Sequence, residues 1–143
     1  MNKLLTILLS ATIFVLLIAI ILLTLTPHEQ DKFTEFYILN DNSKAADYPR
    51  QVKLGEQVRV IIGVVNHENM PMNYKIVIKN GDVEIDSLET GILQANNKWE
   101  NKINLIPNTA GKNQRINFYL FIANQSTPHI EEPLTLILDV VQP

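Results

Sequence analysis

The segment Asn66-His67-Glu68 is the clearest place in this chain where side chains of chemical interest lie together. An imidazole beside a carboxylate could bind a metal ion or move a proton. A metal site needs more ligands, however, and the other two histidines, His28 and His129, lie elsewhere in polar segments without ligand spacing. The simpler interpretation is a turn between strands, in which Asn66 bonds nearby backbone. We therefore predict that this segment binds no metal.

A second group of candidates is acidic. Asp82, Glu84 and Asp86 alternate with apolar residues, which predicts three carboxylates on one face of a strand. Such a face suggests a calcium site or the paired acids of a glycosidase. A solvated strand face, with Lys75 and Lys79 as partners on the neighbouring strand, is the simpler interpretation.

Two further motifs are weak, and the motifs of nucleophilic catalysis are absent. Asp41-Asn42-Ser43 with Asp47 has the oxygens of a cation loop, but lacks the glycine and the distant glutamate of a calcium loop. No Gly-x-Ser-x-Gly, cysteine or glycine-rich phosphate loop is present, so nucleophilic catalysis has no support. Asn124-Gln125-Ser126 has the form of an N-glycosylation acceptor. We predict neither catalytic residues nor a cofactor.

The elements that position these residues are strands. Apolar residues recur with period two over about seven short segments after residue 32, and no long segment there has helical periodicity. Turn signals such as Gly55 separate the segments. This pattern predicts an all-β fold, an immunoglobulin-like antiparallel β-sandwich of about seven strands.

Two local features refine this prediction. Asn80-Gly81 predicts a two-residue type I′ hairpin, after which Val83 and Ile85 would continue the core face. Trp99, the only tryptophan, lies on an alternating strand, and we expect its ring to be buried.

The strands follow an uninterrupted apolar run from Leu4 to Leu25. As a helix this run is about 33 Å long, enough to cross a hydrocarbon core of about 30 Å. It is longer than the apolar core of a secretory signal and has no small-x-small cleavage site, which favours an uncleaved signal-anchor. Lys3 precedes the run and acidic residues follow it, which predicts a cytoplasmic N-terminus.

The domains expected are a cytoplasmic stub with a transmembrane helix over 1–26, a hinge over 27–32 and an extracytoplasmic β-sandwich over 33–143. The net charge of −3 makes nucleic acid a poor partner. With no cysteine, the domain depends on packing for its stability.

Several blocks carry a family resemblance: the run Phe33-Thr34-Glu35-Phe36-Tyr37, then Tyr48-Pro49, Leu54-Gly55-Glu56, Asn66-His67-Glu68 and Asn73-Tyr74. In this order they resemble the extracytoplasmic part of a mainly archaeal family of predicted membrane proteins, domain of unknown function 1616. The resemblance implies a location and a fold, and no activity. Asn40 and Ser43 stand where the family often has glycine, and many members carry several N-terminal membrane helices where this chain has one.

Two functions from different classes fit these observations. The first is a non-catalytic, membrane-anchored module that binds a membrane or surface protein partner. The second is a ligand-binding or hydrolytic ectodomain that acts on envelope glycan through Glu84 and Asp86, or binds a metal ion through His67. The absence of a convergent polar constellation favours the first.

Overall fold

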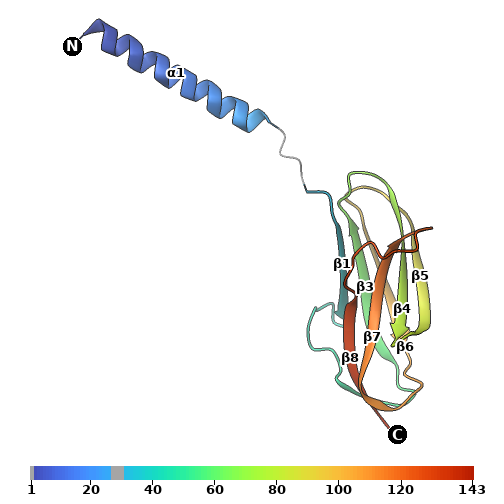
Figure 1. Cartoon of the computed structure of the whole chain (residues 1–143). Coiled ribbons are helices and arrows are strands. Elements are labelled where there is room, and N and C mark those ends of the chain that lie inside the picture. The colour runs from blue at the N-terminus through green and yellow to red at the C-terminus, as the bar shows by residue number, and fades with distance from the viewer. Residues whose placement is uncertain (1, 27–30) are drawn as a thin grey trace. The chain divides into compact units, whose positions relative to one another are not determined.

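The computed structural model describes residues 2–26 and 31–143, which fall into two compact units, Met1–Asp31 and Lys32–Pro143. Of the predicted hinge, residues 27–30 lie outside the described part of the chain, and so does His28. Helix α1 spans Lys3–Leu25 and is long and apolar enough to cross a membrane (Figure 1). Its Ser10 and Thr12 hydroxyls each donate a 2.9 Å hydrogen bond to a carbonyl of the preceding turn. These polar groups are therefore satisfied without water.

The second unit is a β-sandwich, as predicted. Its eight strands are β1 (Thr34–Asn40), β2 (Gln51–Lys53), β3 (Val58–Asn66), β4 (Met72–Asn80), β5 (Val83–Leu93), β6 (Lys98–Leu105), β7 (Gly111–Ile122) and β8 (Leu134–Val141). One strand more is present than the sequence predicted, because β2 has only three residues and shows no usable periodicity.

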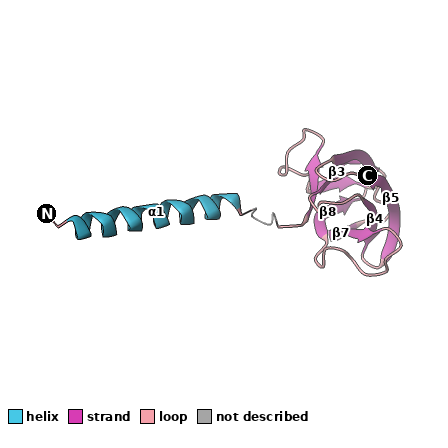
Figure 2. Cartoon of the chain, turned by 90° about the horizontal axis from the view of Figure 1, so that it is seen from above, coloured by secondary structure: helices cyan, strands magenta, loops and turns pink. Residues whose placement is uncertain are grey.

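The strands form two sheets packed face to face (Figure 2). One sheet has the order β1-β3-β6 and the other the order β2-β8-β7-β4-β5. All pairs are antiparallel except β2 with β8, which run parallel. The edge strands β5 and β6 therefore bound the same side of the sandwich, in different sheets.

The core lies between the sheets and follows the alternation read from the sequence. Every second residue of the central strands points inward, because successive side chains of a strand alternate between its faces. The most completely buried apolar side chains are Val58, Val60, Ile62, Val64, Tyr74, Ile76, Ile78, Phe118, Leu120 and Leu138.

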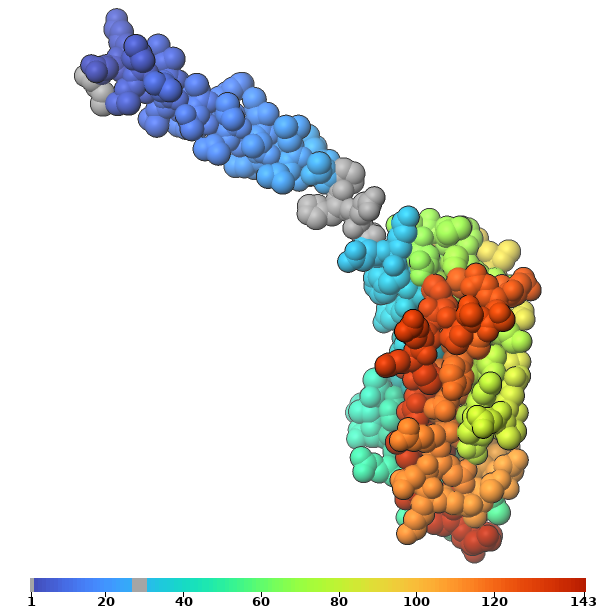
Figure 3. All heavy atoms as spheres, viewed as in Figure 1, coloured from blue at the N-terminus to red at the C-terminus, as the bar shows by residue number. Residues whose placement is uncertain are grey.

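The two ends of the sandwich are named here by the buried asparagine that each contains. Thr34 pairs with Asn66 where β1 begins, and this is the Asn66 end, which also holds the β3–β4, β5–β6 and β7–β8 loops. Asn40 closes β1 at the opposite, Asn40 end, with the β4–β5 and β6–β7 loops. The chain after Asn40 projects from the side of the domain (Figure 3).

Three local predictions need correction. The hairpin turn consists of Gly81 and Asp82, and only Gly81 has a positive φ, +60°, so it is not type I′, which needs two such residues. Val83 and Ile85 are not in the core: they are 67% and 42% exposed, because no strand of the other sheet covers this part of β5. Trp99 is only partly buried and packs at the margin of the core.

Candidate functional site

Asn66 links the strands and the loop at the Asn66 end by hydrogen bonds. It ends β3 with no exposed surface, and its side-chain nitrogen donates to the carbonyls of Met70 at 2.7 Å and Leu93 at 2.8 Å. Its side-chain oxygen accepts from the backbone N–H of Glu68 at 2.9 Å, the turn that the sequence predicts. The bond to Leu93 also ties the three-stranded sheet to β5 of the other sheet. Asn66 is therefore a structural clamp whose side-chain groups are all used within the fold.

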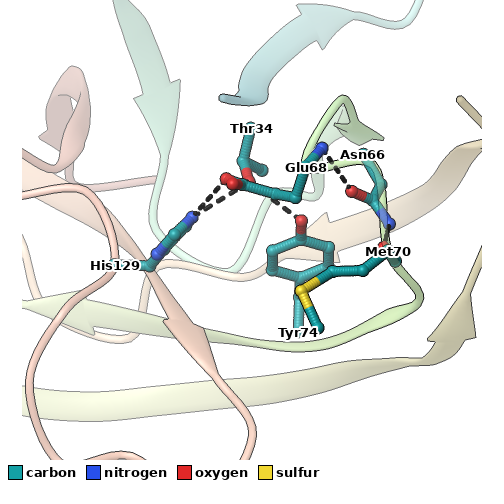
Figure 4. A network of polar contacts seen from close by, with 6 residues as sticks. All are labelled: Thr34, Asn66, Glu68, Met70, Tyr74 and His129. Atoms are coloured by element: carbon teal, nitrogen blue, oxygen red, sulfur yellow. Dashed lines mark hydrogen bonds and ion pairs between the residues drawn. The ribbon is translucent and has the colours of Figure 1, made fainter. Parts of the chain in front are cut away.

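Four side chains converge beside this clamp. Thr34 of β1, Glu68 of the β3–β4 loop, Tyr74 of β4 and His129 of the β7–β8 loop form one polar network (Figure 4). The Thr34 hydroxyl lies 2.7 Å from Glu68 Oε1, 2.8 Å from the Tyr74 hydroxyl and 3.0 Å from His129 Nε2. His129 Nε2 also lies 3.1 Å from Glu68 Oε1. The network thus joins both sheets and two loops.

Counting donors and acceptors assigns the hydrogens. A hydroxyl has one hydrogen and two lone pairs, and Thr34 gives its hydrogen to the Glu68 carboxylate. Tyr74 O–H and His129 Nε2–H then donate to the two lone pairs of Thr34. Every hydrogen-bonding position of Thr34 is occupied by a neighbour within the fold.

This arrangement differs from a catalytic triad. In a triad the imidazole accepts the hydroxyl proton at one ring nitrogen while the acid holds the other nitrogen. Here hydroxyl and carboxylate both contact the same nitrogen of His129, and Thr34 has no lone pair free to attack a substrate. The network is suited to holding strands and loops together.

Tyr74 is the deepest member and is fully buried. Burial raises the pKa of its hydroxyl above the ordinary value near 10, and the Glu68 charge adds to this rise. The phenol therefore stays protonated and remains a hydrogen-bond donor at neutral pH.

His67 points away from this network and forms a separate pair. Its Nε2 lies 3.5 Å from Glu35 Oε2, and its ring stacks on Phe33 with centroids 4.6 Å apart. Within the described residues, no three His, Cys, Asp or Glu side chains are grouped so that they could hold a metal ion. The adjacent residues His67 and Glu68 thus have different partners and do not act as one site.

The other residues of the family blocks have structural roles. Tyr37 lies across Gly63 of β3, where a β-carbon would come within 2.1 Å of its ring, and its hydroxyl donates to Glu100 at 2.6 Å. Tyr48 donates to the Ile38 carbonyl at 2.7 Å. The remaining members are Phe36, which packs on the core, Pro49, which lies before β2, and Gly55, which has a φ of +81°.

The predicted acidic face on β5 is wrong in its geometry. Asp82 lies in the hairpin turn, and a register shift in β5 pairs Glu84 with Lys79 but Asp86 with Ile78. Because Lys79 and Ile78 are adjacent, Glu84 and Asp86 point to opposite faces. The three carboxylates therefore do not share one face. Asn124 is exposed, with a φ of +69°, in the turn after β7.

The sequence did not single out Thr34 or the proximity of His129 to Glu68. The Thr34 contact depends on the pairing of β1 with β3. His129 is brought back by its backbone N–H, which donates to the Leu120 carbonyl at 2.7 Å, in a loop without periodicity. The sequence did indicate two members, Glu68 through the Asn66-His67-Glu68 segment and Tyr74 through the alternation that puts it in the core, but it did not bring them together.

Comparison with known proteins places the chain in a family. Residues 27–138 match the family described as "Domain of unknown function (DUF1616)". The chain belongs to the DUF1616 family. No curated protein matches this DUF1616 member.

Two solved structures show the same fold as this DUF1616 domain. The crystal structure of the CARDB domain of the PF1109 protein from Pyrococcus furiosus, in complex with di-metal ions, has a TM-score of 0.55 at 16% identity and covers 76% of this chain and 90% of that chain. The solution NMR structure of the same domain has a TM-score of 0.56 at 15% identity, with coverage of 77% and 97%. At such identity the likeness concerns the fold alone.

Proposed function

We propose that this protein is a single-pass membrane protein whose β-sandwich lies outside the cytoplasm and acts as a non-catalytic binding or assembly module in a cell-surface or membrane complex. The apolar helix α1 and membership of the DUF1616 family support a membrane-anchored module. The charges that flank the apolar run, Lys3 before and Glu29 and Asp31 after, support a cytoplasmic N-terminus.

One observation carries the non-catalytic part of the proposal. The histidine, carboxylate and hydroxyl that come together in this domain use one another as partners, and the Thr34 oxygen has no lone pair left for a substrate. A catalytic nucleophile needs an unshared lone pair and a base that accepts its proton. Polar groups that are all hydrogen-bonded to one another stabilise the fold. A domain of this kind acts by binding other molecules at its surface.

Orientation is tested first. In intact cells, protease should remove a tag at the C-terminus and leave a tag at the N-terminus uncut. The reverse pattern would contradict the proposed topology. Cleavage of the chain after α1 in the mature protein would contradict the anchor.

Assembly is tested next with the full chain, extracted from native membranes in a mild detergent and run on a native gel. We expect a species larger than the detergent-bound chain alone, with the same size when Thr34 is replaced by Ser. A species the size of the lone chain, together with envelope-glycan hydrolysis that disappears in Glu84→Gln or Asp86→Asn, would contradict the proposal and support the hydrolytic alternative.

The metal-binding alternative has its own measurement. Calorimetric titration of the full chain with zinc, nickel and calcium should give no binding in the micromolar range. Micromolar binding that disappears in His67→Ala or His129→Ala would move this protein into the ligand-binding class.

A further inference from the structure

The side of the sandwich bounded by β5 and β6 is closed at one end and open at the other. At the Asn66 end a short connection joins the two strands, and Leu93 is buried there, with its carbonyl held by Asn66. At the Asn40 end the two strands have no connection, and Val83, at the start of β5, is 67% exposed. The two edge strands therefore leave core-type side chains uncovered at the Asn40 end.

A cleft of about 320 Å³ opens at this place, and we call it the β5–β6 groove. Its apolar lining comes from β5, β6, the chain after β6, β7 and β8: Val83, Ile85, Leu105, Ile106, Ile116 and Leu138. Ile85 and Ile106 are 42% and 56% exposed. A volume near the lower limit for ligand pockets suits a few aliphatic side chains better than a large ligand.

The margin of the groove on the β5 side is acidic. Glu84 lines the groove, Asp82 lies in the hairpin turn beside it, and Asp86 is exposed on the other face of β5, next to the groove-lining Ile85. Among the residues that the structure describes, none of these three takes part in an ion pair. Lys79, which pairs with Glu84 in the strand register, has its ammonium 5.6 Å from the centre of the Tyr119 ring. The negative charge at this margin is thus not neutralised by an ion pair within the described part of the chain.

The edge of β5 is poorly suited to the addition of a partner's strand. Its pairing with β4 has two register shifts, one of which leaves Ile85 as an extra residue, and Gly91 has a φ of +67°. Bulges and inward-pointing charges, such as Asp86 opposite the buried Ile78, are features that block edge-to-edge pairing. Binding here depends on side chains that enter the groove.

We propose that the β5–β6 groove binds a protein segment in which Leu, Ile or Val side chains enter the cleft, while flanking Lys or Arg residues approach the carboxylates on the two faces of the β5 edge, Glu84 on one and Asp86 on the other. This inference rests on the proposed function, because it names the surface by which the module would bind. Apolar contact supplies the attraction, and the complementary charge selects basic segments over acidic ones.

The test uses the full chain in its native membrane, with a photo-cross-linking amino acid at Ile106 or, as a control, at Ile137. Both are exposed isoleucines, but Ile137 lies on β8, away from the groove. We expect an adduct from Ile106 that is absent from Ile137, and mass spectrometry should place the cross-link on an apolar residue with Lys or Arg within a few positions.

Charge reversal then tests the partner's chemistry. The double variant Glu84→Lys and Asp86→Lys should reduce the adduct at least tenfold. The matched variant Glu131→Lys and Glu132→Lys makes the same change of net charge in the exposed β7–β8 loop and should leave the adduct unchanged. Equal melting temperatures of the two variants would show that both are folded.

Four results would overturn the groove proposal: no adduct above the Ile137 control, an adduct with lipid, an adduct with a second copy of this chain or an acidic segment, or an adduct equally strong in both charge variants. The native-gel assay separates this failure from failure of the proposed function. If the large species persists when the groove is empty, only the groove is wrong; if no large species exists, the module itself is wrong.

Discussion

The two ends of this sandwich differ in which side chains they leave exposed to solvent. At the Asn66 end, Thr34, Glu68, Tyr74 and His129 bind one another and shield most of their polar atoms. At the Asn40 end, the β5–β6 groove leaves aliphatic side chains in water beside carboxylates without ion-pair partners in the described chain. The residues of most chemical interest are thus occupied in structure, while the exposed apolar lining of the groove consists of ordinary valine and isoleucine.

The largest effect is expected from Asn66→Ala, which leaves the Leu93 and Met70 carbonyls and the Glu68 N–H without their partner. Unsatisfied buried groups cost about 1–3 kcal/mol each, and partial relaxation should reduce the total to about 2–4 kcal/mol. Chemical denaturation of the full chain in micelles measures this loss.

Asn40→Ala is the matched control at the other end. Asn40 also makes three side-chain hydrogen bonds, but all are to its own loop, at Asn42, Lys44 and Ala46. We expect a smaller loss, about 1–2 kcal/mol. Equal losses would mean that the link between sheets through Leu93 adds nothing.

Thr34→Val should have the next largest effect. Valine has nearly the same shape but removes the hydroxyl that Glu68, Tyr74 and His129 share. We expect a loss of about 1.5–2 kcal/mol, because Tyr74 is left buried without a partner. Thr135→Val, which removes one exposed bond to Asn117, should cost less than about 0.5 kcal/mol. If Thr34→Val and Thr135→Val had the same melting temperature, the network would contribute nothing to the stability of the Asn66 end.

Alkaline pH should weaken the Asn66 end through Tyr74. Burial raises the pKa of this residue, so the folded protein holds the phenol proton more tightly than the unfolded chain does. Its contribution to the free energy of unfolding is therefore complete below about pH 10 and is lost as the pH rises through the folded pKa.

Tyr74→Phe should give a flatter decline of the free energy of unfolding above pH 10. Tyr37 and Tyr48, whose pKa values burial also raises, should account for the remaining decline. Parallel curves for the two proteins would contradict this role of Tyr74.

The smallest effect is expected at the groove. Val83→Ser and Ile106→Ser replace exposed side chains and should each change the free energy of unfolding by less than about 0.5 kcal/mol. Leu138→Ala, in the floor of the same groove but almost fully buried, should cost about 2–5 kcal/mol. A large loss in Val83→Ser would show that the groove closes over this residue and belongs to the core.

How far the sequence could predict this molecule depends on the range of the interactions. Period-two alternation identified the strands that hold Ile76 and Phe118, because the burial of one strand face shows in the order of neighbouring residues along the chain. The turn at Asn66 was predictable for the same reason, since Asn66 Oδ1 accepts from a residue two positions on. The alternation also assigned Val83 to the core, wrongly, because a strand pattern does not say whether another sheet covers it. The contact of His129 with Glu68 had no local signal at all.

The parallel pairing of β2 with β8 has a consequence for the timing of folding. Val52 pairs with Val140, and β8 lies between β2 and β7, so the five-stranded sheet is completed only when nearly the whole domain is available. Topologies dominated by such distant contacts fold in milliseconds to seconds rather than microseconds. In a chain that emerges N-terminus first, β7 can already pair with β4, but its other edge stays unpaired until β8 follows. An unpaired strand edge of this kind favours aggregation for as long as it is exposed.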